Sequence, residues 1–180
     1  RGEENDVLSR YYQCAKKNDV DVIVRLTADC PLVDPEIIDE VVRIYLEKNV
    51  DYASNTVPVE SSTFPDGCDV EVFSFKALEK AYQNCRDLHD REHVTFYFWK
   101  HENGFKTAQL TRKPDLSGYR FTVDYPDDFE VIEFVLNELD RRNIFGSLKE
   151  IVGIIEDNQQ IKEKNSRFSS GMGWEQNGGG

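Results

Sequence analysis

The sequence lacks long apolar runs, closely spaced cysteines and an excess of basic residues. Apolar segments such as residues 22–24 and 154–155 fall far short of the ~20 residues that cross a bilayer, so no membrane span is predicted. The four cysteines lie far apart and form no Cys-x-x-Cys pair, which favours reduced thiols and a cytoplasmic location over a disulfide framework. Neither a signal segment nor an initiator Met is found at Arg1, so we expect the chain to begin inside a longer gene product.

Acidic residues outnumber basic ones, 34 Asp and Glu against 22 Lys and Arg, which leaves a formal net charge of −12. This balance excludes the basic field by which a protein binds a nucleic-acid polymer. An anionic small substrate would instead need a metal ion or a local basic pocket. With 180 residues, 39% of them apolar and 12% aromatic, the chain is suited to one globular domain with a substantial core, and disordered and fibrous classes are excluded.

Patterns typical of strands and helices alternate along the chain. Residues 21–26 form a short, β-branched and nearly continuous apolar segment, which is typical of a strand buried on both faces of a parallel sheet. The alternation predicts an α/β domain with a mainly parallel sheet and flanking helices. We expect further strands at 50–54, 69–73, 105–110 and 119–123, and helices at 5–18 with Asn5 as N-cap, 35–48, 75–82, 91–101, from Pro126 onward, and 147–157.

Two loops share a short pattern, an Asp two residues before a Pro. Asp29 precedes Pro31 after the strand at 21–26, and Asp124 precedes Pro126 after the strand at 119–123. Ligands of α/β sheets bind beyond the carboxyl ends of the strands, so two such carboxylates could clamp one Mg²⁺ and, through it, a nucleoside triphosphate. The alternative is that each Asp only caps the helix that follows.

A set of ordered motifs carries a resemblance to a known family. They are NDVLSRYY at 5–12, RLTADCPL at 25–32, FPDGCDVE at 64–71, REHVT at 91–95 and TVDYPDDFE at 122–130. In this order they resemble the cytidylyltransferase family that includes spore coat polysaccharide biosynthesis protein F and is related to the CMP-KDO and CMP-sialic acid synthetases. The resemblance covers roughly residues 1–160.

The resemblance implies a Rossmann-like nucleotide-diphospho-sugar transferase fold. It implies transfer of CMP from CTP to a sugar acid or related sugar in surface polysaccharide biosynthesis, with release of pyrophosphate. Asp29 and Asp124 match the family's metal-binding aspartates, so Mg²⁺ is the implied cofactor and both residues are implied to be catalytic. Residues implied to bind substrate are Asp66, Asp69, Glu71, Arg91, Glu92 and His93.

The family's first strand and the Gly-, Ser-, Arg- and Lys-containing loop that wraps the triphosphate have no counterpart before Asn5. Anion sites depend on such backbone N–H groups and cations. We therefore expect residues 1–164 to be the C-terminal part of a cytidylyltransferase domain, incomplete at its N-terminus and inactive alone. Residues 165–180 are rich in Ser, Gly and Asn and are expected to form a disordered tail.

Other interpretations stay open. His89, Glu92 and His93 fit the short H-x-x-E-H zinc pattern, although Arg91 beside them opposes metal binding. The chain could also be a non-catalytic sugar-nucleotide-binding module or a metal-dependent glycosyltransferase that uses Asp29 and Asp124.

Two further features are interpreted as structural. Asp127, Asp128 and Glu130 are first-turn acids favoured by the helix dipole. The aromatic run at 96–99 exceeds what one helix face can bury, which predicts a homodimer, as the family resemblance also does.

Overall fold

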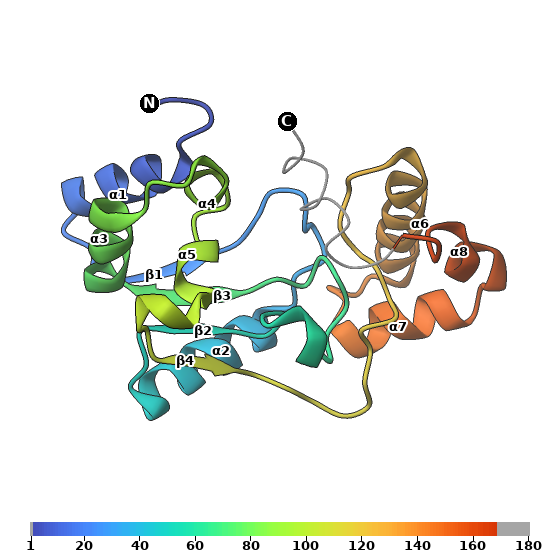
Figure 1. Ribbon diagram of the computed structural model, residues 1–180. Helices are drawn as coiled ribbons and strands as arrows, with labels where there is room; N and C mark the ends of the chain where they lie inside the picture. The colour runs from blue at the N-terminus through green and yellow to red at the C-terminus, as the bar shows by residue number, and fades with distance from the viewer. Residues whose placement is uncertain (1, 169–180) are drawn as a thin grey trace.

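The computed structural model describes residues 2–168. A four-stranded sheet lies among helices on both of its faces (Figure 1). The strands are β1 (Val22–Arg25), β2 (Tyr52–Ser54), β3 (Glu71–Ser74) and β4 (Thr107–Gln109), in the order β1-β3-β2-β4. The helices are α1 (Val7–Lys17), α2 (Pro35–Lys48), α3 (Phe75–Asn84), α4 (Leu88–His93), α5 (Phe96–Trp99), α6 (Pro126–Arg142), α7 (Leu148–Glu156) and α8 (Gln159–Lys164), with 3-10 turns at Val59–Ser61 and His101–Asn103. These elements confirm the α/β class.

Neighbouring residues of β2 and β3 point to opposite faces and join two separate cores. Tyr52 and Phe73 pack with side chains of α1, α3 and α5. Ala53 and Val72 pack with α2, α6 and α7. None of the helices in residues 2–168 combines the length and apolar character required to cross a bilayer.

The sheet is mixed, whereas the sequence patterns predict a mainly parallel one. β3 runs antiparallel to both β1 and β2, and the β2–β4 pair is parallel. The expectation assumed that a helix crosses over between successive strands. Residues 55–70, which connect β2 to β3, contain a 3-10 turn and no α-helix, and a connection without a crossover allows antiparallel pairing.

β1 lies at an edge of the sheet and is not buried on both faces. Within residues 2–168 its strand partner is β3 alone, and Val22 and Val24 keep 40% and 42% of their surface exposed. Ile23 points the other way and packs against the core that contains Tyr52. A continuous apolar run is compatible with a central or an edge position, so the pattern alone could not decide between them.

Residues 119–123 are extended but are not a strand of the sheet. A single bridge joins Arg120 to Asp66, and the N–H of Phe121 donates to the Asp66 carbonyl at 2.6 Å. Further along, the N–H of Val123 donates to the Asp29 carbonyl at 2.9 Å. These backbone bonds place the segment beside the end of β1 and beside the loop that leads to β3.

Two of the predicted helices differ at their ends. The helix expected at 91–101 is broken at Val94, whose φ of 66° is incompatible with a right-handed helix, so α4 and α5 are separate. The first helix is capped by Asp6, not Asn5, because the Asp6 carboxylate accepts from the Ser9 N–H at 3.0 Å. The helices expected at 35–48 and 147–157 begin as predicted, and the side chains of Asp34 and Ser147 cap them.

The aromatic run at 96–99 packs within the chain. Phe98 is buried, and Tyr97 and Trp99 pack against the core on the same face of the sheet. Because the chain breaks at Val94, the run forms the separate short helix α5, and its side chains are not limited to one face of a longer helix. The homodimer stays a prediction that this run does not support.

The end of the domain lies further along the chain than expected. Asn165 is 5% exposed, and Phe168 packs on Tyr125, so residues 165–168 belong to the folded unit. The remainder of the expected tail, residues 169–180, lies outside the described residues.

Gly67 is the residue at which the loop before β3 passes closest to residues 121–122. Its φ is +88°, and a Cβ built there would lie 2.2 Å from the Thr122 nitrogen. We expect Gly67→Ala to lower the free energy of unfolding by at least ~2 kcal/mol, because backbone strain and a backbone clash act together. Gly104 is the matched control, since it also has a positive φ of +66° but no atom within 4 Å, and Gly104→Ala should cost only about 1 kcal/mol. Urea unfolding of both variants measures the difference, and equal losses would contradict the predicted contact.

Candidate functional site

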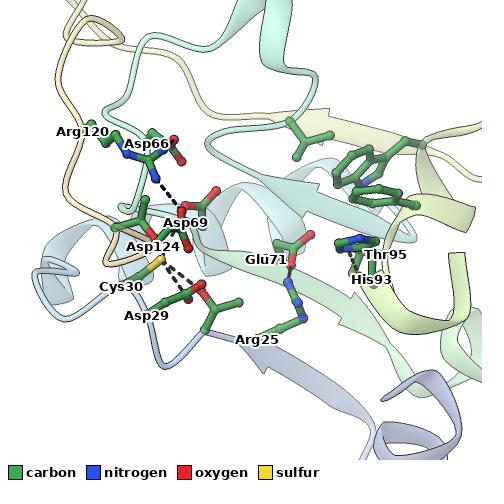
Figure 2. A pocket seen from close by; sticks show the side chains of 15 residues that line it. Arg25, Asp29, Cys30, Asp66, Asp69, Glu71, His93, Thr95, Arg120 and Asp124 are labelled. Carbon is green, nitrogen blue, oxygen red and sulfur yellow. Dashed lines mark hydrogen bonds and ion pairs between the residues drawn. The ribbon is translucent and has the colours of Figure 1, made fainter. Parts of the chain in front are cut away.

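A cavity of about 240 Å³ opens where β1 ends and β3 begins. The antiparallel pairing of Arg25 with Glu71 places the last residue of β1 beside the first residue of β3, at the same end of the sheet. The lining comes from four parts of the chain and is shown in Figure 2: residues 25–30, the loop from Val57 to Glu71, residues 93–99 and residues 120–124. Segments far apart in the sequence therefore meet at one edge of the sheet.

Carboxylates gather at one end of this cavity. Figure 2 shows Asp66, Asp69 and Asp124 close together, with Asp29 and Cys30 beside them. The Cys30 thiol lies 3.6 Å from Asp29 Oδ1 and 3.8 Å from Asp69 Oδ2. Burial and the Asp69 charge raise the pKa of Cys30, so this thiol stays protonated and is no nucleophile at neutral pH.

Arg120 is the cation of this acidic end. Its Nη1 lies 2.6 Å from Asp66, its Nη2 2.5 Å from Asp124 and its Nε 3.0 Å from Asp128. The Arg120 side chain is 5% exposed, whereas that of Asp124 is 38% exposed. One guanidinium thus forms ion pairs with three carboxylates, and Asp124 remains accessible to a ligand.

The remaining carboxylates are held by neutral donors. Asp69 accepts from the Thr56 hydroxyl at 2.6 Å and from the Gly67 N–H at 3.0 Å, yet its burial raises its pKa. Burial and the Asp69 charge raise the pKa of Asp66 to about 7, against the opposing effect of Arg120. Burial and the neighbouring negative charge therefore both favour a proton on Asp66, and a bound cation would offset the excess of negative charge.

The other end of the cavity is aromatic and contains the Arg25–Glu71 ion pair (Figure 2). Glu71 also accepts from the Tyr52 hydroxyl at 2.6 Å, and the Trp99 indole N–H donates to that hydroxyl at 3.1 Å. The His93 ring stacks on Phe96 with centroids 4.3 Å apart.

Two buried nitrogens at this end, Arg25 Nε and His93 Nε2, have no hydrogen-bond partner within the described part of the chain. Burial and the neighbouring His89 lower the pKa of His93, which keeps its imidazole neutral at pH 7. Unsatisfied buried polar atoms are rare in folded proteins, so these two indicate a place where a polar ligand binds.

The cavity brings together six of the eight predicted site residues, namely Asp29, Asp66, Asp69, Glu71, His93 and Asp124. Arg91 and Glu92 do not line it. Arg91 forms an ion pair with Asp6 at 2.8 Å and joins α4 to α1, and Glu92 is exposed. Successive residues of a helix point in directions about 100° apart, so a motif on α4 can direct only some of its side chains into the cavity.

A repeated heptapeptide could have revealed two of the missed residues. RLTADCP at 25–31 and RFTVDYP at 120–126 share Arg, Thr, Asp and Pro at the same spacing. Arg25, Thr27 and Asp29 line the cavity from the first copy, and Arg120, Thr122 and Asp124 line it from the second. The pattern Asp-x-Pro considered alone left out both arginines.

The zinc interpretation of H-x-x-E-H gains no support from the geometry. Within residues 2–168, the group whose potential ligand atoms lie within 4.8 Å of one another is Asp87, His89 and Asp90, without Glu92 or His93. Asp87 caps α4, and Asp90 forms an ion pair with Lys100 at 2.5 Å, so both have structural roles.

Asp66 generates a prediction about pH. The folded chain takes up the Asp66 proton near pH 7, and the unfolded chain near pH 4, so between these values the folded state binds more protons and its stability falls as the pH rises. Asp66→Asn removes this effect. From pH 5 to 7.5 we expect the stability of the variant relative to the wild type to rise by roughly 1 kcal/mol or more, measured by urea unfolding. A difference that stays constant or shrinks would show that Asp66 titrates in its ordinary range.

Comparisons with known proteins identify the family of this chain. The cytidylyltransferase family model matches residues 1–166. A structure of a cytidylyltransferase from Leptospira borgpetersenii has a TM-score of 0.76 and 31% sequence identity, and the match covers 94% of this chain and 68% of that one.

Two curated relatives are also similar. An uncharacterized protein of Methanocaldococcus jannaschii is 38% identical over 92% of this chain and 66% of its own length. Spore coat polysaccharide biosynthesis protein SpsF of Bacillus subtilis is 28% identical over 79% of this chain and 58% of its own length. The chain thus spans about three fifths to two thirds of the relatives it matches. The family model extends over the whole cavity, from β1 to the second Asp-x-Pro, and on this basis the chain belongs to the cytidylyltransferase family.

Proposed function

We propose that this chain provides the metal and sugar half of an enzyme that transfers CMP from CTP to a sugar acid and releases pyrophosphate. The observation that carries the proposal is one cavity with Asp29 and Asp124 at one end and two unpartnered nitrogens among aromatic rings at the other. Family membership supports nucleotidyl transfer, and the name of the Bacillus subtilis relative supports a role in surface polysaccharide biosynthesis.

The acidic end fits a magnesium ion. Carboxylate oxygens are the donors that Mg²⁺ prefers, and one or two of them suffice when substrate phosphates and waters complete the shell. Asp29 and the partly exposed Asp124 are the residues that would hold it. A bound Mg²⁺ would neutralise charge on the phosphates of CTP.

Arg120 affects how Asp124 could bind a cation. It pairs with Asp124, so a cation that binds Asp124 competes with the guanidinium. Arg120 retains Asp66 and Asp128 as partners when Asp124 is engaged, and its charge therefore stays compensated. Attack of a sugar hydroxyl on the α-phosphorus needs positioning and charge neutralisation more than covalent chemistry, and these are what fixed carboxylates and a fixed guanidinium supply.

The aromatic end fits the sugar acid. The rings of Phe96 and Trp99, which line the cavity, would give an apolar wall for the face of a sugar ring, and Arg25 lines the same end. Arg25 Nε can donate to a carboxylate or hydroxyl, and neutral His93 Nε2 can donate or accept according to its tautomer. Since Glu71 already pairs with the Arg25 guanidinium, the choice of a sugar acid as acceptor rests on the family resemblance.

The same two aspartates could hold a nucleotide sugar in a metal-dependent glycosyltransferase. Pyrophosphate release separates the two reactions, because a nucleotidyltransferase releases it from CTP and a glycosyltransferase acting on UDP-sugars does not. We also expect turnover to require sequence outside residues 1–180, because the resemblance places the triphosphate loop in a segment that this chain does not contain. The assay therefore uses the complete gene product together with residues 1–180 alone.

Asp29→Asn and Asp124→Asn test the metal end. Each substitution keeps the shape of the side chain and removes the charge that holds the cation, so we expect turnover to fall at least about tenfold, a loss of ~1.4 kcal/mol in transition-state stabilisation. Pyrophosphate release from CTP with Mg²⁺ is measured over a panel of sugar acids. Asp115→Asn, at an exposed position outside this cavity, is the control. Unchanged rates for Asp29→Asn and Asp124→Asn would remove both residues from the mechanism.

His93→Gln tests the sugar end. The loss of an imidazole beside the acceptor should raise the KM for the sugar acid roughly fivefold or more, about 1 kcal/mol, and leave the KM for CTP within about twofold. His101→Gln at an exposed 3-10 turn is the matched control. Equal effects on both substrates would place His93 outside the sugar site.

A further inference from the structure

Residues 165–168, which follow α8, fold back onto the segment that carries Asp124. The buried Asn165 side-chain amide donates to the Arg120 carbonyl at 3.1 Å and to Asp128 Oδ1 at 2.9 Å. The Phe168 ring stacks on Tyr125, with centroids 4.3 Å apart and planes 10° from parallel. We call residues 165–168 the C-terminal strap.

Asp128 connects the strap to Asp124. It is fully buried, and its Oδ2 accepts from the backbone N–H groups of Asp124 and Tyr125, both at 3.1 Å. Its carboxylate also accepts from Arg120 Nε at 3.0 Å and Nη2 at 3.1 Å. Although burial opposes ionisation, the bonds from Arg120 and Asn165 lower the pKa of Asp128. The backbone of Asp124 is therefore held by a charged group that Asn165 helps to satisfy.

The aromatic contact acts on the same segment. Tyr125 directly follows Asp124, and the Arg120 guanidinium lies beside both stacked rings, 5.7 Å from the Tyr125 centroid and 5.8 Å from that of Phe168. Arg167 pairs with Asp127 and adds an ionic contact between the strap and the first turn of α6. Backbone, ring and guanidinium are thus contacted by one short stretch of chain.

We propose that Asn165 and Phe168 are positioning residues, which hold Asp124 and Arg120 in the arrangement that binds a divalent cation. The inference rests on the metal role of Asp124 in the proposed function. Neither residue lines the acidic cavity, so both act through Asp128, Tyr125 and Arg120. Groups that orient a metal ligand affect affinity because they remove the need to order that ligand when the ion binds. Phe168 lies just beyond residues 1–166, the range that the family model matches.

The test is a titration of the 180-residue chain with Mn²⁺, followed by the electron paramagnetic resonance of the free ion. Asn165→Ala and Phe168→Ala should each raise the Mn²⁺ Kd at least about threefold. Phe168→Tyr keeps the stacked ring and should restore the wild-type Kd. Lys164→Ala is the matched control, because Lys164 ties α8 to α6 through Glu130 at 2.6 Å without contacting Asp128. Thermal unfolding confirms that each variant is folded at the temperature of the titration.

The outcomes separate the strap from the metal site. If Asn165→Ala and Phe168→Ala are less stable but bind Mn²⁺ as the wild type does, the strap is structural only and the proposal is wrong. Phe168 is only half-buried, so Phe168→Ala is expected to fold. Its Mn²⁺ Kd can therefore be measured even if Asn165→Ala fails to fold. If the wild type has no Mn²⁺ site that Asp124→Asn removes, the metal role of Asp124 fails as well, and the strap's positioning role fails with it.

Discussion

The acidic end of the site depends on one buried guanidinium, which pairs with three of its carboxylates. Arg120 contacts Asp66, Asp124 and Asp128, and its side chain is almost withdrawn from solvent. Burying a charge is costly unless it is paired and hydrogen-bonded, and Arg120 uses Nε and both terminal nitrogens for this purpose. Three carboxylates against one cation still leave negative charge in excess. Burial and this excess together raise the pKa of Asp66. The same excess would attract a divalent ion, in a chain whose net charge of −12 would otherwise repel a nucleotide.

The scaffold reaches this arrangement through backbone bonds outside the sheet as much as through the sheet itself. β1 and β3 bring Arg25 beside Glu71, but Asp124 arrives on an extended segment that is no strand. Its position is secured by the bond from Val123 N–H to the Asp29 carbonyl and by the bridge between Asp66 and Arg120. Gly67 lets this segment approach closely, because any Cβ there would collide with residues 121–122. Asp29 and Asp124 therefore reach the same cavity through backbone contacts between distant segments, which hydrophobic periodicity does not encode.

Much of this could be predicted from local chemistry, and the rest depended on pairing. Asp34 followed by Pro35, and Ser147 followed by Glu150, specify helix starts within four residues, so these caps were predictable. The direction of β3 was not, because a strand has the same period whichever way it runs. The break at Val94 was not either, since the sequence around it shows no Gly or Pro. Asp29 and Asp124 could be matched by their shared pattern, whereas the ion pair between Arg120 and Asp66 joins residues that lie 54 positions apart in the sequence.

The two arginines of the repeated heptapeptide lie at the two unlike ends of one cavity. Each copy begins with an Arg and has an Asp at the cavity four residues later, and each Arg pairs with a carboxylate of the segment from Asp66 to Glu71. Arg120 takes Asp66, at the start of that segment, and Arg25 takes Glu71, at its end. The two pairs differ in what surrounds them. Around Arg120 lie further carboxylates, which leave negative charge for a cation, whereas around Arg25 lie Tyr52, Trp99 and His93, which leave a donor facing an apolar wall. The two arginines of the same local pattern therefore have different surroundings because different segments of the chain pack around each of them.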